Sequence, residues 1–405
     1  MTPSGSGPMR PDRLGPWVLA VCLLLAIHTG ARAPSLWSVQ YYVPDFVSGF
    51  VRRGLAGTLL LPLGDHRFHY LPIVVVQMVV FAGLARCGVR LVQRVDRPAR
   101  LVLAAFLLGP AGGFLFHTLG YVDHLLVLLL LAAVCSKHHG VAAVLLASSL
   151  LVHEMALFFT VPLFVVFRVL RTGRHAPALL GLGASLVAFA GIYLFFQVPD
   201  PNDVAAFVEL LRGKTDYPLR VDYYHVFVNA FEARIGLYYW HLDQTFGSHS
   251  LPLAGLALLG CAAVGWLGAA VAPPLSLPAG SWLERTLSER TQRLLFGHAT
   301  AAACAAPLLL GLFGWDVHRW IFLALASATG TAVLLAGRLP PGHRARRIGL
   351  GCLAVVLLGF VVLACGFGID FGYFDQYRPR PWNAEALHAF LTRDLWDELS
   401  RIPRF

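Results

Sequence analysis

The sequence has few charged residues. Asp, Glu, Lys and Arg make up 13% of its 405 residues, whereas hydrophobic residues make up 57%. Soluble globular domains contain about 25% charged residues, and the charges present here separate long apolar runs. The sequence therefore excludes a soluble protein. It predicts an all-α, polytopic transmembrane helical bundle, with residues 1–405 forming a single integral membrane domain.

The cysteines lack the spacing of a zinc site or of a disulfide framework. None belongs to a CxxC motif, and all lie inside or at the ends of apolar runs. Metal sites and disulfide frameworks require recognisable spacings, so we interpret these cysteines as small hydrophobic residues. They are Cys22, Cys87, Cys135, Cys261, Cys304, Cys352 and Cys365.

Nine apolar runs are expected to span the membrane. They cover residues 16–33, 69–86, 101–116, 122–135, 176–197, 250–272, 294–313, 319–337 and 348–368. More than half of the Lys and Arg residues lie at the N-terminus and in the breaks 86–100, 136–140, 168–175, 273–293 and 338–347. Basic loops stay on the cytoplasmic side. We therefore expect a multi-pass protein of the cytoplasmic (plasma) membrane, with its N-terminus in the cytoplasm and its C-terminus outside. The net charge of +10 then reflects topology, and no nucleic-acid partner is expected.

Residues 141–167 interrupt a simple alternation of spans. They lie between two basic breaks, so a single crossing would place one break on the wrong side. A short helical hairpin with His153 and Glu154 at its tip restores the pattern. Each arm would be about 18–20 Å long at 1.5 Å per residue, which leaves the tip at membrane depth, where ionisable groups indicate function. A single long tilted helix is the alternative.

The remaining ionisable residues are expected on the outer face, mainly in the loops 34–68 and 198–249 and in the C-terminal tail 369–405. Two stretches there have the period of amphipathic surface helices. They are residues 202–213 and residues 383–402, and Asn383 is expected to cap the second.

The stretch 41–57, YYVPDFVSGFVRRGLAG, places Asp45, Arg52 and Arg53 close to the membrane. Read as a helix that starts near Asp45, it puts Asp45 and Arg52 on one polar stripe, about 10 Å apart along the axis. A carboxylate and guanidinium groups held in this way suit a general base and a phosphate clamp. Alternatively, Asp45 caps the helix and the arginines contact lipid head groups.

Two more outer segments contain candidate substrate-binding residues. The turn 117–125 has His117, Asp123 and His124, where Asp123 could instead be the N-cap of the following helix. In the segment 314–320, Asp316 can cap the next span.

His318 and Arg319 follow Asp316 directly. A cation such as Arg319 in the first turn of a helix is disfavoured by the macrodipole, which indicates an anionic partner, either Asp316 or a ligand phosphate. The acids and histidines of these outer segments would also suit Mg²⁺ or Mn²⁺. No pair has the spacing of a helical zinc motif, so we assign no metal ligand.

The arrangement resembles the GT-C class of polytopic glycosyltransferases in its general layout, with Asp45 in the first outer loop followed by an amphipathic segment. The resemblance implies transfer of a sugar from a polyprenyl-phosphate donor to an envelope acceptor on the outer face, with Asp45 as catalytic base. His153 and Glu154 would assist proton transfer or line the cavity. Arg52, Arg53 and Arg319 would neutralise the departing phosphate. The expected partners are the lipid-linked donor and membrane lipids.

Two other functions remain open at this point. A multi-span transporter or lipid flippase would place its binding groups near the midplane, in broken helices related by internal repeats. A non-catalytic partner in envelope-polymer assembly would need neither Asp45 nor Arg52. The sequence names neither the sugar nor the acceptor, and it leaves the oligomeric state open.

Overall fold

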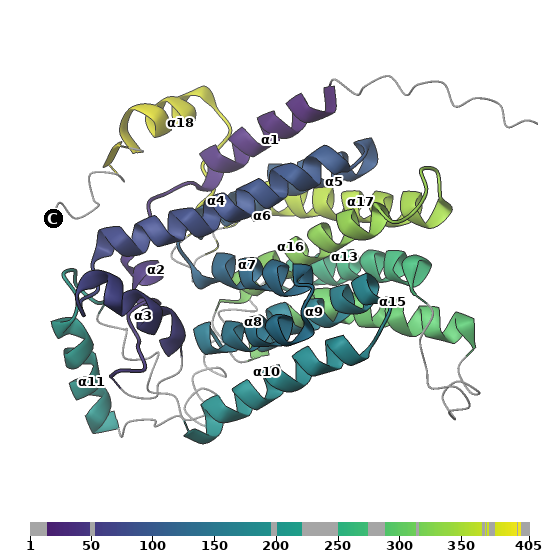
Figure 1. Cartoon of the computed structure of the whole chain (residues 1–405). Coiled ribbons are helices and arrows are strands. Elements are labelled where there is room, and N and C mark those ends of the chain that lie inside the picture. The colour runs from purple at the N-terminus through teal and green to yellow at the C-terminus, as the bar shows by residue number, and fades with distance from the viewer. Residues whose placement is uncertain are drawn as a thin grey trace, which may run out of the picture.

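A computed structural model describes residues 14–48, 53–195, 201–220, 250–273, 288–312, 316–366, 369, 371, 377–394 and 396–397. Every regular element within these ranges is a helix (Figure 1). The first half contains α1 (Leu14–Gly30), α2 (Leu36–Gln40), α3 (Gly54–Leu60), η1 (Leu61–Gly64), α4 (Tyr70–Arg94), α5 (Arg97–Leu108), α6 (Pro110–His117), α7 (Val122–Cys135), α8 (His139–Val152), α9 (Ala156–Thr172) and α10 (Ala176–Phe195). The second half contains α11 (Pro201–Gly213), α13 (Ser250–Val271), α15 (Glu289–Ala305), η3 (Ala306–Leu312), α16 (Val317–Ala336), α17 (Arg344–Gly366), α18 (Ala384–Ala389) and η4 (Phe390–Asp394).

Within the described ranges, six helices are long and apolar enough to cross a membrane, so the expected nine spans are not confirmed. The six are α4, α10, α13, the continuous pair α15–η3, α16 and α17. Of the other three runs, those in α1 and α7 are shorter apolar helices, and 101–116 divides into α5 and α6 with a bend of 68°. The bend lies at Gly109 and Pro110. Proline disfavours helical geometry in the residue before it, and Gly109 is extended (φ −80°, ψ 167°).

The helical hairpin expected at 141–167 is present. Two contacts show that the arms α8 and α9 run antiparallel. Near the tip, Ser149 Oγ lies 3.3 Å from Thr160 Oγ1. At the other end of the arms, Arg168 Nη2 donates to His139 Nδ1 at 2.6 Å. The chain reverses at His153, which is extended (φ −163°, ψ 128°).

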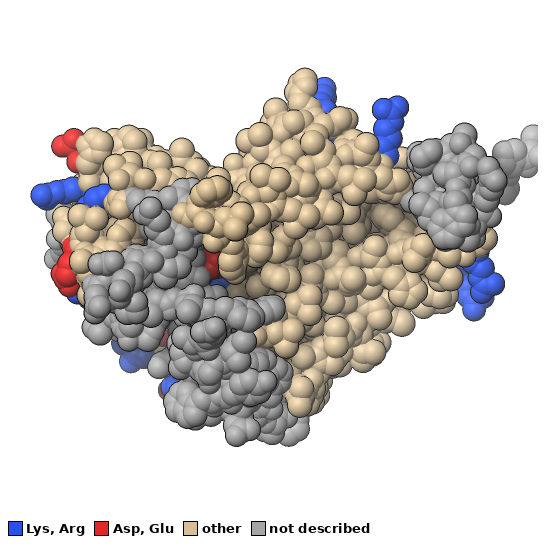
Figure 2. Space-filling model, turned by 90° about the horizontal axis from the view of Figure 1, so that it is seen from below, with Lys and Arg blue, Asp and Glu red and all other residues tan. Residues whose placement is uncertain are grey.

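Four of the basic breaks meet at one end of the bundle. Arg338 donates to the carbonyl of Leu170 at 2.9 Å, and Arg346 forms an ion pair with Asp96 at 2.5 Å. Helices α3 and α11 lie at the opposite end (Figure 1). On the face shown in Figure 2, acidic residues gather toward the α11 end, while the middle is almost free of charge. The two sets of loops therefore separate as expected, and which set faces the cytoplasm stays a prediction.

Helix α16 forms the centre of the bundle. Buried residues make up 83% of its apolar window, against 22–39% for the other five candidate spans. The outward faces of those five helices expose large aliphatic side chains such as Val79, Leu194 and Val355, as a lipid-facing surface would. The central position of α16 matters for the site, because its first turn contains Arg319.

The predicted amphipathic segment 202–213 is helical, and the predicted segment 383–402 is helical over residues 384–394, with 395 and 398–402 outside the described residues. α11 buries Val208 and Leu211, two of the positions that its sequence period assigned to the apolar face. In the tail, the Asn383 side chain accepts the Ala386 N–H at 2.7 Å and so caps α18 as predicted.

Candidate functional site

Asp45 lies in the turn between α2 and α3 and is fully buried. Its carboxylate accepts hydrogen bonds from the Ser48 N–H at 2.7 Å and the Ser48 hydroxyl at 2.8 Å. Lys214, just after α11, lies with Nζ 3.2 Å from Asp45 Oδ2 and also donates to Ser48 Oγ. The lysine side chain keeps 22% of its surface exposed. Asp45 is therefore an ion-paired carboxylate beneath a half-buried lysine.

The prediction that a helix starts near Asp45 is wrong. Residues 46–48 form a bend, and α3 begins only at Gly54. The Phe46 N–H donates to Thr58 Oγ1 at 2.8 Å, a side-chain partner that replaces the helical bond. Residues 49–52 fall outside the described part, and Arg52, one of the predicted phosphate ligands, lies among them. The described residues 46–48 contradict the regular polar stripe proposed for Asp45 and Arg52.

Arg53 makes a two-pronged ion pair with Glu154 at the tip of the hairpin. Nε donates to Oε2 at 2.9 Å and Nη2 to Oε1 at 2.5 Å. The guanidinium lies 5.6 Å from the centroid of the Tyr41 ring, within reach of a cation–π contact. Burial disfavours the charged guanidinium, but Glu154 outweighs that effect and raises the pKa of Arg53. Arg53 also has a left-handed backbone (φ 66°), a conformation that costs a non-glycine residue about 1–3 kcal/mol.

His153 supports the turn at the tip of the hairpin. Its Nδ1 accepts the Met155 N–H at 3.1 Å and lies 3.5 Å from the Glu154 carboxylate. The ring packs 5.7 Å from the Tyr41 ring, centroid to centroid. With Nδ1 accepting, the ring proton of the neutral form is on Nε2. His153 and Glu154 thus remain together with Arg53, as the prediction of a functional tip requires.

Arg319 and Asp123 form the second ion pair. Arg319 Nε donates to Asp123 Oδ2 at 3.0 Å, and Nη2 donates to the other carboxylate oxygen. Asp316, the predicted partner, lies 3.6 Å from Arg319 Nη1. Arg319 therefore has two carboxylate partners, Asp123 and Asp316. Asp123 is not a helix cap: the N-cap of α7 is Tyr121. Asp316 occupies the N-cap position of α16, but its side chain makes no capping bond.

Two tyrosines join these ion pairs into one cluster. The rings of Tyr41 and Tyr121 lie 5.7 Å apart, and the Arg319 guanidinium lies 5.3 Å from the Tyr121 ring. Burial raises the pKa of the Tyr41 phenol although Arg319 and Arg53 act in the opposite direction, so the phenol keeps its proton. We call Tyr41, Arg53, Asp123, Glu154 and Arg319, together with Tyr121, the arginine–carboxylate cluster.

Three more predicted histidines contact neighbouring helices or the tail. His117 packs against the Tyr377 ring at 4.7 Å. His124 has Nε2 3.1 Å from the Leu115 carbonyl, and His318 has Nε2 3.3 Å from Ser250 Oγ. His124 also follows Asp123 directly and interacts electrostatically with Asp123 and Arg319, so it borders the cluster. None of the three contacts is with Asp45 or Arg53.

A metal site has no support in the described ranges. Nowhere in them do three or more His, Cys, Asp or Glu side chains come close enough together to hold an ion. The carboxylates that could have bound Mg²⁺ or Mn²⁺ are instead paired with arginine or lysine, as for Asp123, Glu154 and Asp45.

Sequence reasoning missed Lys214 and the two tyrosines. Lys214 had a signal, because the sequence contains one other lysine, Lys137, and Lys214 directly follows an amphipathic stretch that is predicted to lie on the outer side. Tyr41 and Tyr121 had none, because aromatic residues are ordinary at membrane boundaries. The site contains carboxylates, planar guanidinium groups and a lysine ammonium group. Each cation could give up its carboxylate partner within the protein and bind an anionic ligand in its place.

Comparisons with protein-family models, with curated proteins and with solved structures found no match.

Proposed function

We propose that the chain is a membrane glycosyltransferase that takes a sugar from a polyprenyl-phosphate donor at the α3–α11 end of the bundle. One observation carries the proposal: six ionisable groups, which form three ion pairs, are buried or half-buried in the arginine–carboxylate cluster and beneath α11. Such groups are costly inside an apolar bundle. Their concentration at one end supports a polar reaction site there.

Asp45 is the general base in this proposal. It removes the proton from an acceptor hydroxyl, and the resulting oxygen attacks the anomeric carbon of the donor. The bond between that carbon and the phosphate oxygen breaks, and the polyprenyl phosphate leaves with the bonding electron pair. Lys214 and Arg53 neutralise the charge that develops on the phosphate.

The proposal requires the internal ion pairs to open. A general base must reach its proton within about 2.6–3.2 Å, and Asp45 is covered by Lys214 and Ser48. Donor phosphate competes for Lys214, and it also competes with Glu154 for the planar fork of Arg53. Glu154, 16% exposed in the ion pair, then becomes a second carboxylate available to the acceptor. Arg319 and Asp123 are nearly inaccessible and support the tyrosines.

A transporter is the second candidate, and the bend between α5 and α6 favours it. Broken helices are typical of transporter binding sites, but those sites lie near the bilayer midplane. The α5–α6 break does not include Asp45, Arg53 or Lys214, so the transferase proposal explains more of the buried charge.

The test measures sugar transfer by purified protein in detergent. The donor is a polyprenyl-phosphate hexose labelled in the sugar, supplied with an extract of envelope lipids and polymers as acceptor. The proposal expects label in the acceptor fraction and release of polyprenyl phosphate. Transport would instead move intact donor across a proteoliposome membrane without cleavage. Asp96→Asn is the matched control, because it breaks the Asp96–Arg346 ion pair at the opposite end.

A further inference from the structure

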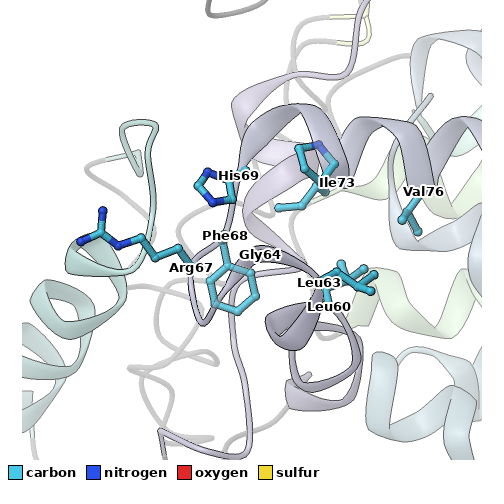
Figure 3. A pocket seen from close by; sticks show the side chains of 9 residues that line it. Leu60, Leu63, Gly64, Arg67, Phe68, His69, Ile73 and Val76 are labelled. Carbon is cyan, nitrogen blue, oxygen red and sulfur yellow. The ribbon is translucent and has the colours of Figure 1, made fainter. Parts of the chain in front are cut away.

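A pocket opens beside the site, between η1 and the first two turns of α4 (Figure 3). It has an empty volume of about 260 Å³, part of it open to the surroundings. One wall consists of Leu60, Leu63 and Gly64, and the other consists of Ile73 and Val76. The walls of the pocket are therefore mainly apolar.

The polar groups of the pocket lie at one end. Arg67 and His69 precede the first residue of α4, and the apolar residues Ile73 and Val76 follow along the helix. From His69 to Val76 the helix rises about 10 Å at 1.5 Å per residue. The Arg67 side chain is exposed and has no ion-pair partner in the described part of the chain. The groove thus has a basic end and an apolar end, like a space for a lipid head and chain.

Asp216 fixes the orientation of His69. Its Oδ2 lies 2.6 Å from His69 Nδ1, and its Oδ1 accepts the Tyr70 N–H at 3.1 Å. The Cδ2–Nε2 edge of the imidazole faces Gly64, where a Cβ would come within 3.1 Å of Cδ2 and 3.7 Å of Nε2. Asp216 therefore holds the ring with its Cδ2–Nε2 edge against the pocket wall.

The pocket lies where lipid head groups are expected. Helix α4 is one of the six candidate spans, so its N-terminus marks a membrane boundary. Next to the groove, Leu63 and Val75 are 70% and 52% exposed, as on a lipid-facing surface. Anionic head groups attract basic residues at such a boundary by about 1 kcal/mol per Lys or Arg.

We propose that this pocket binds one anionic phospholipid of the bilayer, with its phosphate at Arg67 and one acyl chain between η1 and α4. Both carboxylate oxygens of Asp216 already have hydrogen-bond partners, His69 and the Tyr70 N–H. Asp65, which caps η1 and is exposed, is an acidic neighbour that opposes the lipid. The lipid adds a partner that the transfer reaction does not require.

The bound lipid would also stabilise the segment that contains Lys214. The Phe68 N–H donates to the Lys214 carbonyl at 2.7 Å, and the Asp216 N–H donates to the Phe68 carbonyl at 3.3 Å. The pocket wall and the lysine above Asp45 therefore share a short backbone link. Lipid binding is expected to raise the thermal stability of the whole protein, because it binds the folded state alone.

The test is native mass spectrometry of the full chain with phosphatidylglycerol and with phosphatidylcholine of the same chains. We expect one tightly bound phosphatidylglycerol and a clear preference over phosphatidylcholine. Arg67→Gln should lower that preference roughly fivefold, and Asp65→Asn should raise it. Leu63→Trp fills the groove and should abolish binding of the one tight lipid. Leu59→Trp is the matched control, because Leu59 is similarly exposed (66%) and is not among the residues that line the pocket.

The outcomes separate this proposal from its rivals. Equal binding of the two phospholipids, or unchanged binding by Leu63→Trp, would overturn it. Tight binding of polyprenyl phosphate with no phosphatidylglycerol would also overturn it, and would identify the groove as part of the donor site. Thermal unfolding of each variant in detergent alone shows whether a loss of binding reflects a loss of fold.

Discussion

Arg53 and Glu154 are 101 residues apart in the sequence and form a two-pronged ion pair, with Arg53 Nε 2.9 Å from Oε2 and Nη2 2.5 Å from Oε1. This pair connects the N-cap residue of α3, Arg53, to the tip of the α8–α9 hairpin. Both side chains retain some exposure, 11% and 16%, so the pair lies at the boundary between the protein interior and its surroundings. Its partial exposure makes it the pair within the arginine–carboxylate cluster that a ligand can open.

The first prediction concerns this pair. Arg53→Lys keeps the charge but loses the planar fork, so donor binding should weaken more than turnover. Glu154→Gln leaves Arg53 without its internal competitor and should strengthen binding of a phosphate-bearing donor. The measurement is donor KM against kcat in the transfer assay. Weaker donor binding by Glu154→Gln would show that the carboxylate contacts the donor and does not compete with it.

The Arg319–Asp123 pair should behave as a structural pair. Its side chains are 2% and 6% exposed, and removal of one partner from a buried pair costs about 3–5 kcal/mol. We therefore expect Asp123→Asn to lower the melting temperature strongly. The double variant Asp123→Leu with Arg319→Met should recover much of that loss, because it removes both deeply buried charges at once and the other carboxylate beside Arg319, Asp316, is 25% exposed. A melting temperature for the double variant below that of Asp123→Asn would contradict this interpretation.

Gly57 is expected to be essential for the position of Asp45. A Cβ at Gly57 would lie 2.1 Å from the Pro44 carbonyl oxygen and 2.9 Å from the Tyr42 carbonyl oxygen, and both contacts are with backbone. Gly57→Ala should therefore displace the turn and cost about 1–3 kcal/mol or more. Gly88→Ala in α4 is the control, since nothing lies within 4 Å of its Cβ. Alanine there should be neutral or stabilising by up to about 1 kcal/mol. Thermal unfolding distinguishes the two.

The membrane orientation can be tested with described, exposed residues at the two ends. Glu209 lies on α11 and Arg293 lies near the start of α15. In a variant without native cysteines, Glu209→Cys should react with an impermeant maleimide in intact cells, and Arg293→Cys should react only after permeabilisation. Reaction of both sites in intact cells, or the reverse pattern, would refute the predicted orientation.

Much of the helical layout could be predicted because long apolar runs and basic breaks have direct physical causes. The hairpin was predicted from charge alone, and Arg168 shows why it forms. Arg168 donates to the Ser136 carbonyl at 2.7 Å and to His139, so the basic residue that set the topology also joins the ends of the arms. The number of spans was less predictable, because Gly109 and Pro110 divide an apolar run whose hydropathy gives no sign of the bend.

The site was only partly predictable for a different reason. Local spacing suggested that Asp45 and Arg52 act together on one helix, but Asp45 is paired with Lys214, 169 residues away. The partner of Arg53 is likewise distant. Pairings of this kind depend on how helices pack, and no local period in the sequence reports them. The sequence identifies ionisable residues whose burial is costly. Which residues they pair with is seen only in the folded structure.

The last prediction tests whether Asp45 is a base or a structural partner of Lys214. Asp45→Asn retains an oxygen for the Ser48 N–H, but it replaces the ion pair with a neutral contact. A catalytic base would lose roughly 100-fold or more in turnover at normal protein level, whereas a purely structural carboxylate would lose stability with little change in turnover per folded molecule. Lys214→Gln separates the two further. It leaves Asp45 buried without its cation, so stability should fall, and donor affinity should fall as well if Lys214 contacts the phosphate. The transfer assay and thermal unfolding are measured on both variants and on Asp96→Asn. Full turnover by folded Asp45→Asn would remove Asp45 from the chemistry and leave it as the residue that fastens α11 to the first outer loop.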